Sequence, residues 1–233
     1  MSIEENVKRV KEEMAAACSR CGVAPGSVLL CAATKMNDAH RVREAIAAGV
    51  DICGENRVQE LTEKLEQGAY EGCPLHFIGR LQKNKVKYIV GKVELIHSAD
   101  SVELIEVINK RAAAMGTTQD ILLEVNIGGE EAKGGFAPEK LWEILPLMAD
   151  FQAVRVRGLM AIPPICENME ENRPYFRAMK QLVVDIGAKK YDTVSMDFLS
   201  MGMSADFQAA IEEGANIVRV GSGIFGARNY NCH

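Results

Sequence analysis

Short apolar segments alternate with amphipathic segments along nearly the whole of this 233-residue chain. The apolar segments have the character of strands buried on both faces, as in parallel sheets. We predict strands at Val28–Thr34, Val50–Cys53, Leu75–Ile78, Glu94–His97, Ile121–Asn126, Val154–Ile162, Thr193–Ser200 and Asn216–Val220. We predict helices at Ala39–Ala48, Arg57–Gln67, Asn84–Val90, Val102–Met115, Pro138–Asp150, Met169–Gly187 and Ala205–Glu213. Eight strands, each separated from the next by one helix, indicate an α/β fold, a (β/α)8 TIM-like barrel. A doubly wound open sheet is the main alternative.

An extra helix is predicted before the first strand. Its apolar stripe consists of Ile3, Val7, Val10, Met14, Ala17 and Cys21. Ser2 and Glu5 have the spacing of a capping box at its start, and Gly22 is suited to end it. Because no linker-like or low-complexity segment interrupts the chain, we expect residues 1–233 to form a single barrel domain.

Charge and cysteine content narrow the classes of function. The formal net charge of -5 gives no electrostatic footprint for nucleic acid. No run is long enough to cross a membrane, and the acidic amino terminus is unlike a signal peptide. The seven cysteines are scattered and suggest no disulfide framework, so a cytoplasmic location is expected. Cys18 and Cys21 form a C-x-x-C pair without a second pair of ligands, so we predict no metal site.

Lys35 ends the first apolar run and precedes a turn-like segment. Parallel α/β folds place their chemistry at the carboxyl ends of strands. Desolvation lowers the pKa of an ammonium group, so a lysine there can form a Schiff base with an aldehyde or ketone. A lysine that extends out of a strand end into solvent is the competing interpretation of this run alone.

The last predicted strand carries Arg219, a charge inside an apolar run that requires a partner or a ligand. Gly221 and Ser222 follow it in a Gly-Ser-Gly turn whose backbone amides suit a phosphate group. Ser204 lies just before a predicted helix, where its hydroxyl could join a second phosphate loop or serve as an ordinary helix cap.

Two further polar residues lie at or near predicted strand ends. Asn56 follows the second strand and could cap the next helix or direct its amide at a ligand. His76 lies inside an apolar strand, where a hydrogen-bonded core histidine is the favoured interpretation.

Ordered motifs extend over nearly the whole chain. They are Thr34-Lys35, Gly54-Glu55-Asn56-Arg57-Val58-Gln59-Glu60, His76-Phe77-Ile78-Gly79 through Leu81-Gln82 to Asn84-Lys85, Glu124-Val125-Asn126, Glu130 with Lys133 and Gly135, Arg157-Gly158-Leu159-Met160, Leu199-Ser200-Met201-Gly202-Met203-Ser204 with Asp206, and Arg219-Val220-Gly221 with Ile224-Phe225-Gly226. Together they resemble the motifs of the pyridoxal 5'-phosphate (PLP) homeostasis proteins, which are similar to the barrel domain of alanine racemase. Leu75 departs from the tryptophan that often precedes His-Phe-Ile-Gly in the family.

The resemblance implies that Lys35 holds PLP as a Schiff base, whereas the residues by themselves do not distinguish PLP from a phosphorylated sugar aldehyde. It also implies that Arg219 faces the pyridine nitrogen and that Asn56 lies near the ring. Ser204, Gly221 and Ser222 would hold the phosphate. It assigns no role to His76 or Lys133.

Two classes of function fit this resemblance. We favour a non-catalytic protein of PLP homeostasis that stores PLP and delivers it to apo-enzymes, with no catalytic residue and acting as a monomer. A PLP-dependent amino-acid racemase is the alternative, although racemisation needs an acid or base on each face of the substrate carbon. The racemases supply the second group as a tyrosine from another domain, and we expect no such domain here. A Schiff-base aldolase fits the residues but not the family motifs.

Overall fold

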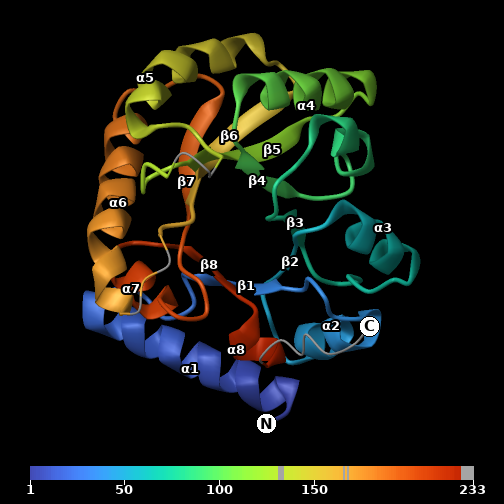
Figure 1. Ribbon diagram of the computed structural model, residues 1–233, viewed down its shortest axis with the longest axis vertical. Helices are drawn as coiled ribbons and strands as arrows, with labels where there is room; N and C mark the ends of the chain where they lie inside the picture. Colours follow the sequence, from blue (N-terminus) through green and yellow to red (C-terminus); the bar gives the residue numbers. More distant parts are fainter. Residues whose placement is uncertain (131–133, 165, 167, 227–233) are drawn as a thin grey trace.

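The computed structural model describes residues 1–130, 134–164, 166 and 168–226. Its strands form a closed, parallel barrel in chain order, in which β8 returns to pair with β1 (Figure 1). The strands are β1 (Leu29–Ala33), β2 (Ile52–Glu55), β3 (Leu75–Phe77), β4 (Leu95–Ala99), β5 (Gln119–Val125), β6 (Val154–Ala161), β7 (Val194–Ser200) and β8 (Ile217–Val220). The predicted (β/α)8 barrel is confirmed, and the open-sheet alternative is wrong.

Helices surround the barrel, as the alternating pattern predicted (Figure 1). The α-helices are α1 (Ile3–Cys21), α2 (Ala39–Ala47), α3 (Val58–Glu66), α4 (Val102–Ala114), α5 (Leu141–Ile144), α6 (Arg173–Gly187), α7 (Phe207–Glu212) and α8 (Ser222–Phe225). The 3₁₀ helices are η1 (Lys83–Tyr88), η2 (Pro138–Lys140), η3 (Leu145–Asp150) and η4 (Met169–Asn172). The one helix predicted at Pro138–Asp150 is three short pieces, and Pro146 in the first turn of η3 has no amide proton to continue the α-helical bonds from α5.

The predicted amino-terminal helix is present as α1, with the predicted caps. The Ser2 hydroxyl accepts a bond from the Glu5 amide, and the Glu5 carboxylate accepts one from the Ser2 amide in return. Gly22 ends the helix in the left-handed conformation, with φ of 71°. The helix packs along α7 and α8 at the edge of the barrel (Figure 1).

The apolar core has two parts, because side chains alternate between the two faces of each strand. The smaller part fills the barrel interior and includes Cys31, Leu122 and Ile217. The larger part lies between the strands and the surrounding helices and includes Phe77 and Phe176. Among the helices of the described residues, none combines the length and apolar character that a bilayer crossing needs.

Both ends of β2 differ from their predicted positions, and the shift at its carboxyl end concerns the site. Strand β2 begins at Ile52 and continues to Glu55, two residues beyond its predicted end at Cys53. A glycine and a glutamate are poor strand formers, but the Glu55 side chain is fully buried and bonded within the protein. Because all eight strands are parallel, their carboxyl ends open at one mouth of the barrel, where the predicted site residues are found.

Candidate cofactor-binding site

Lys35 lies two residues beyond the end of β1 and is half-buried. Met36 follows it with φ of 60°, a left-handed conformation that costs a non-glycine residue on the order of 1 kcal/mol. Asn37 closes this turn, because its backbone amide donates to the Thr34 carbonyl (3.2 Å) and its side-chain amide donates to the Lys35 carbonyl (3.0 Å). The lysine is thus attached to a tightly folded strand end and not to a loose loop.

Arg219 is buried in β8, and its guanidinium group points toward the ends of two other strands. One terminal nitrogen donates to the Ser200 hydroxyl on β7 (2.6 Å), and the other donates to the Ala161 carbonyl on β6 (2.9 Å). Burial lowers the pKa of Arg219 from its ordinary value, but an arginine still carries its charge at neutral pH. The sequence predicted that Arg219 needs a partner or a ligand, and in the structure its partners are a hydroxyl group and a backbone carbonyl.

A hydrogen-bonded chain continues from Ser200 across the barrel interior. The Ser200 hydroxyl contacts Nδ1 of His97 on β4 (3.0 Å), and Nε2 of His97 contacts Nδ1 of His76 on β3 (2.9 Å). Burial lowers the pKa of His76 to about 4 and lowers that of His97 as well, so both rings are neutral at pH 7. The preference for His76 as a bonded core histidine is confirmed.

The order of donors in this chain follows from Arg219, which can only donate. Ser200 accepts from Arg219, and its own proton then points to Nδ1 of His97. His97 therefore carries its proton on Nε2 and donates to Nδ1 of His76. In the opposite order, both Arg219 and His97 would donate to Ser200, and the Ser200 proton would have no acceptor among these four side chains.

Glu124, near the end of β5, adds a carboxyl group whose charge is coupled to that of Arg219. Burial, followed by the negative charge of Asp100, raises the pKa of Glu124 from 4.5 to about 7, while Arg219 and Arg80 act in the lowering direction. The carboxyl group therefore changes its protonation state near neutral pH, as acids and bases in functional sites commonly do. In the sequence Glu124 is part of a family motif, and only the fold places its carboxyl group where the charges of Asp100 and Arg219 act on it.

Ser204, Gly221 and Gly223 meet at one point. The Ser204 hydroxyl oxygen accepts from the Gly221 amide (3.1 Å) and from the Gly223 amide (3.3 Å). Ser204 does not cap the helix that follows it, because α7 begins at Phe207 and Asp206 is the residue before it. Asp206 instead holds the loop, accepting from the Met203 amide (2.7 Å) and the Asn172 side chain (2.8 Å). Ser222 is exposed and is the first residue of α8.

Asn56 is not a helix cap either. Arg57 is the residue that precedes α3, and Asn56 lies between it and the end of β2. The buried Oδ1 atom of Asn56 has no hydrogen-bond partner among the described residues. A buried oxygen without a hydrogen bond destabilises the fold unless a ligand donates a hydrogen bond to it. Gly79 lies against this residue so closely that a Cβ atom there would be 2.1 Å from the Asn56 carbonyl oxygen.

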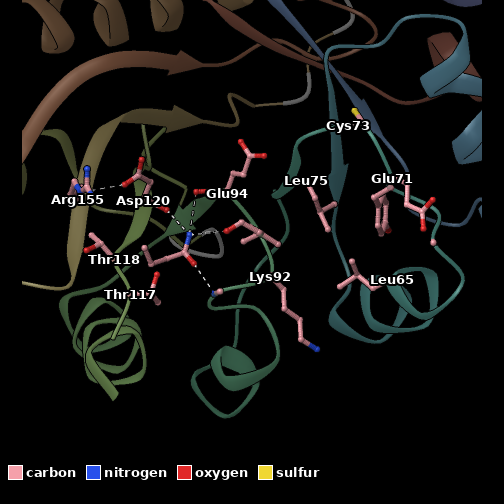
Figure 2. Close-up of a pocket in the computed structure, with 15 residues that line it drawn as sticks. Leu65, Glu71, Cys73, Leu75, Lys92, Glu94, Thr117, Thr118, Asp120 and Arg155 are labelled. Carbon is pink, nitrogen blue, oxygen red and sulfur yellow. Dashed lines mark hydrogen bonds and ion pairs between the residues drawn. The ribbon is translucent and has the colours of Figure 1, made fainter. Parts of the chain in front are cut away.

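A pocket at the opposite end of the barrel contains none of the predicted site residues. Its volume is about 700 Å³, and it is lined by residues that precede or begin β3, β4, β5 and β6 (Figure 2). Asp120 and Arg155 face each other on one wall, with 3.9 Å between Oδ1 and Nε (Figure 2). Gln119 in its lining is bonded to the backbone at both ends of its amide. Barrels of this type carry their sites at the carboxyl-terminal mouth, so we assign the site there.

Several polar residues at the mouth were not singled out from the sequence. His97, Ser200 and Glu55 lie in predicted strands or next to them, and Lys64 lies in a predicted helix. The sequence does not predict that Glu55 and Lys64 are buried together, because a buried glutamate and lysine have the same residue types as a pair exposed to solvent. Lys133 lies outside the described residues. The described part of the chain contains no group of three or more histidine, cysteine or acidic side chains placed to hold a metal ion.

Comparisons with known proteins agree with this geometry. The family model described as the alanine racemase N-terminal domain matches residues 2–229. The pyridoxal phosphate homeostasis protein of Aquifex aeolicus (strain VF5) is 46% identical over 230 residues, which cover 99% of this chain and 100% of the relative.

Two solved structures are also similar. An unknown protein from Bifidobacterium adolescentis has a TM-score of 0.90 and 38% identity, over 96% of this chain and 94% of that chain. PipY of Synechococcus elongatus PCC7942, solved with PLP bound, has a TM-score of 0.80 and 33% identity, over 93% of this chain and 100% of that chain. The resemblance found in the sequence motifs is thereby confirmed. The chain belongs to the alanine racemase N-terminal domain family and, within it, to the pyridoxal phosphate homeostasis proteins.

Proposed function

We propose that residues 1–233 form a single-domain PLP-binding protein that acts in PLP homeostasis as a monomer, holding PLP as a Schiff base on Lys35 and delivering it to apo-enzymes. The observation that carries the proposal is the position of Arg219, and of Ser204 bonded to Gly221, at the mouth where Lys35 follows β1. The name of the Aquifex relative and the PLP bound to PipY support it.

The residues at the mouth suit the chemical parts of PLP. Lys35 has the primary amine that an aldehyde requires. The Ser204 hydroxyl and the Ser222 amide suit a phosphate dianion, because a hydroxyl and backbone N–H groups are its usual donors. Gly221 supports the same group, because its amide donates to the Ser204 oxygen and holds that hydroxyl in place. The unpartnered atom of Asn56 is available to a polar substituent of the ring. When bound, PLP supplies an electrophilic aldehyde carbon and an electron-withdrawing ring.

The charge of Arg219 favours storage over catalysis. A guanidinium group can donate a hydrogen bond to the ring nitrogen, but it does not give up its proton. The nitrogen then stays unprotonated, which weakens the ring as an electron sink. Arg219 is held in place for this task by Ser200 and Ala161.

The described tyrosines offer no second acid or base at the mouth. The Tyr70 hydroxyl is buried against Glu55, Tyr88 ends η1, Tyr175 lies in α6 and Tyr191 precedes β7. Tyr230 lies outside the described residues. The carrier function needs no catalytic residue, and we assign none.

The attachment site can be tested by reduction with borohydride and peptide mass mapping. We expect the PLP-loaded protein to lose its visible absorbance and to carry a pyridoxyl group on Lys35. Lys35→Ala is the control, which should acquire no label in that peptide. A label found only on another lysine, such as Lys133, would refute the assignment.

A second candidate function, PLP-dependent amino-acid racemisation, is favoured by Glu124. With its pKa raised to about 7, this carboxyl group can accept or donate a proton at neutral pH, as the second acid or base requires. Incubation with single L-amino acids distinguishes the two functions. Production of D-isomer that is lost in both Lys35→Ala and Glu124→Gln would establish the racemase, whereas a carrier should not exceed the rate of free PLP.

A further inference from the structure

A buried ion pair lies next to the strand end that carries Lys35. Lys64 in α3 and Glu55 at the end of β2 are 2.7 Å apart, and their side chains are 7% and 0% exposed. The Lys64 ammonium group also donates to the Thr34 carbonyl (2.8 Å) and to Oε2 of Glu60 (3.2 Å). All three of its protons are therefore used within the protein.

Glu55 connects this pair to the residues on either side of it. Its Oε2 atom accepts from the Thr34 hydroxyl (2.9 Å) and from the Tyr70 hydroxyl (3.2 Å). Its Oε1 atom accepts from the backbone amide of Asn56 (2.8 Å). One carboxylate thus fixes the residue before Lys35 relative to Asn56.

Glu60 holds the residue after Lys35. Its Oε2 atom accepts from the backbone amide of Met36 (2.7 Å), the residue with the left-handed conformation. Thr34 and Met36 are therefore both bonded to side chains of α3, and Lys35 lies between them.

The energetics of a buried ion pair point to positioning. The desolvation of two charges offsets most of their attraction, and apolar residues of similar volume often stabilise a fold as well. Apolar residues cannot, however, form hydrogen bonds with the carbonyl and hydroxyl groups of Thr34 or with the amide of Met36. The three charged residues Glu55, Glu60 and Lys64 make such bonds at every residue that flanks Lys35.

We propose that these three residues, which we call the α3 clamp, are positioning residues that set the backbone at Lys35 so that its amine meets an aldehyde held at the mouth. The inference rests on the proposed function of Lys35. A ligand whose phosphate is bound by the loops after β7 and β8 has its aldehyde at a set distance from them. The Lys35 backbone must then be equally fixed, since small displacements of reacting atoms cost large factors in rate.

Glu60 is the residue of choice for the test, because its side chain is partly exposed and its removal leaves the buried pair intact. In Glu60→Ala, the Met36 amide loses its acceptor, whereas Glu60→Gln keeps a carbonyl oxygen for it. Glu63→Ala on the exposed side of the same helix is the matched control. For each protein, the rate of PLP capture is followed by absorbance, and hydrogen exchange of the Met36 amide is measured without PLP.

We expect Glu60→Ala to capture PLP about tenfold more slowly or worse and to lose protection of the Met36 amide. Glu60→Gln should restore both, and Glu63→Ala should match the wild type. Unchanged capture in Glu60→Ala, or slow capture with the Met36 amide still protected, would overturn the clamp. Failure of the wild type itself to label Lys35 would instead overturn the proposed function. Lys64→Met, if it folds, should show the same defect in capture.

Discussion

At the scale of single residues, Ser204 shows how one hydroxyl can serve two loops. Its oxygen accepts from the backbone amides of Gly221 and Gly223, which follow β8, and its own proton is donated to none of the described residues. The predicted role as a helix cap would have used the amides of its own segment. The two amides thus hold the hydroxyl in place, and the hydroxyl proton can be donated to a phosphate oxygen.

We predict that Ser204→Ala weakens PLP binding more than pyridoxal binding. A charge-assisted bond to a dianion is worth about 1.5–3 kcal/mol, which corresponds to a loss of about tenfold or more for PLP only. Titration by absorbance gives both dissociation constants. Ser195→Ala, at the other end of β7, is the control. An equal loss for the two ligands would remove Ser204 from the phosphate site.

Glu124 makes a pH-dependent contribution whose sign can be worked out. Its pKa is 4.5 in the unfolded chain and about 7 in the fold, so the folded protein binds the extra proton between these values. Stability from this group therefore falls as pH rises from 4.5 to about 7. The lowered pKa values of His76 and His97 act in the opposite direction, because the unfolded chain then binds more protons as pH falls below 6.5.

We predict that Glu124→Gln stabilises the ligand-free protein relative to the wild type by more at pH 8 than at pH 5. The difference should be on the order of 2 kcal/mol, since each pKa unit corresponds to about 1.4 kcal/mol. The histidines are common to both proteins and cancel in the comparison. Urea unfolding at the two pH values measures it, with the exposed Glu106→Gln as control. Parallel stability curves for variant and wild type would contradict the raised pKa.

At the scale of elements, α8 depends on α1. A helix of four residues is not stable by itself, and α8 has two of its carbonyls bonded to side chains of α1. Asn6 donates to the Ile224 carbonyl (2.9 Å), and Arg9 donates to the Gly223 carbonyl (3.0 Å). On the other side, Arg41 of α2 donates to the Phe225 carbonyl and to the Asn37 side chain, which joins α8 to the turn after Lys35. The extra amino-terminal helix therefore shapes the site.

We predict that Asn6→Ala lowers both the stability of the fold and the affinity for PLP. The buried Ile224 carbonyl loses its donor, which costs about 1–3 kcal/mol, and the loop that bears Gly221 is less well held. Urea unfolding and PLP titration measure the two effects. Ser19→Ala, an exposed change in the same helix, should alter neither. Normal PLP affinity in Asn6→Ala would show that α1 does not support the site.

At the scale of the whole molecule, closure of the barrel collects residues from distant parts of the chain at one mouth. Lys35 follows β1, Asn56 follows β2 and Arg219 lies in β8, and β1 pairs with both β2 and β8. The hydrogen-bonded series from His76 to Arg219 crosses the barrel interior and joins β3, β4, β7 and β8. The site is therefore built on rigid strand ends, which suits a protein that must hold a cofactor.

We predict that the PLP-loaded protein restores the activity of an apo PLP enzyme and that Lys35→Ala changes the time course. A carrier releases PLP at a rate set by its own Schiff base, whereas the variant holds PLP through non-covalent contacts only. The assay compares the recovery of enzyme activity after addition of the PLP-loaded protein with its recovery after addition of an equal concentration of free PLP. In a separate experiment, light scattering during size-exclusion chromatography tests the proposed monomer. Identical time courses for wild type and Lys35→Ala would argue against storage on Lys35.

Local patterns in the sequence were sufficient for much of this molecule. The alternation of apolar and amphipathic segments predicted eight strands, and the stripe from Ile3 to Cys21 predicted α1 with its caps. The position of Lys35 at the end of a buried strand was also a local property. These features depend on residues close together in the chain, whose spacing reflects helix and strand periodicity.

Other features were decided by the tertiary structure alone. The partners of Arg219, the bond from Gly221 to Ser204 and the burial of Glu55 with Lys64 join residues from different strands and helices. Spacing carries no trace of such contacts, and a buried charge pair has the same composition as an exposed one. The four residues of α8 lacked a helical signal because neighbouring helices, and not their own sequence, hold them. Closure of the barrel decided which strand ends became neighbours, and with it which residues form the site.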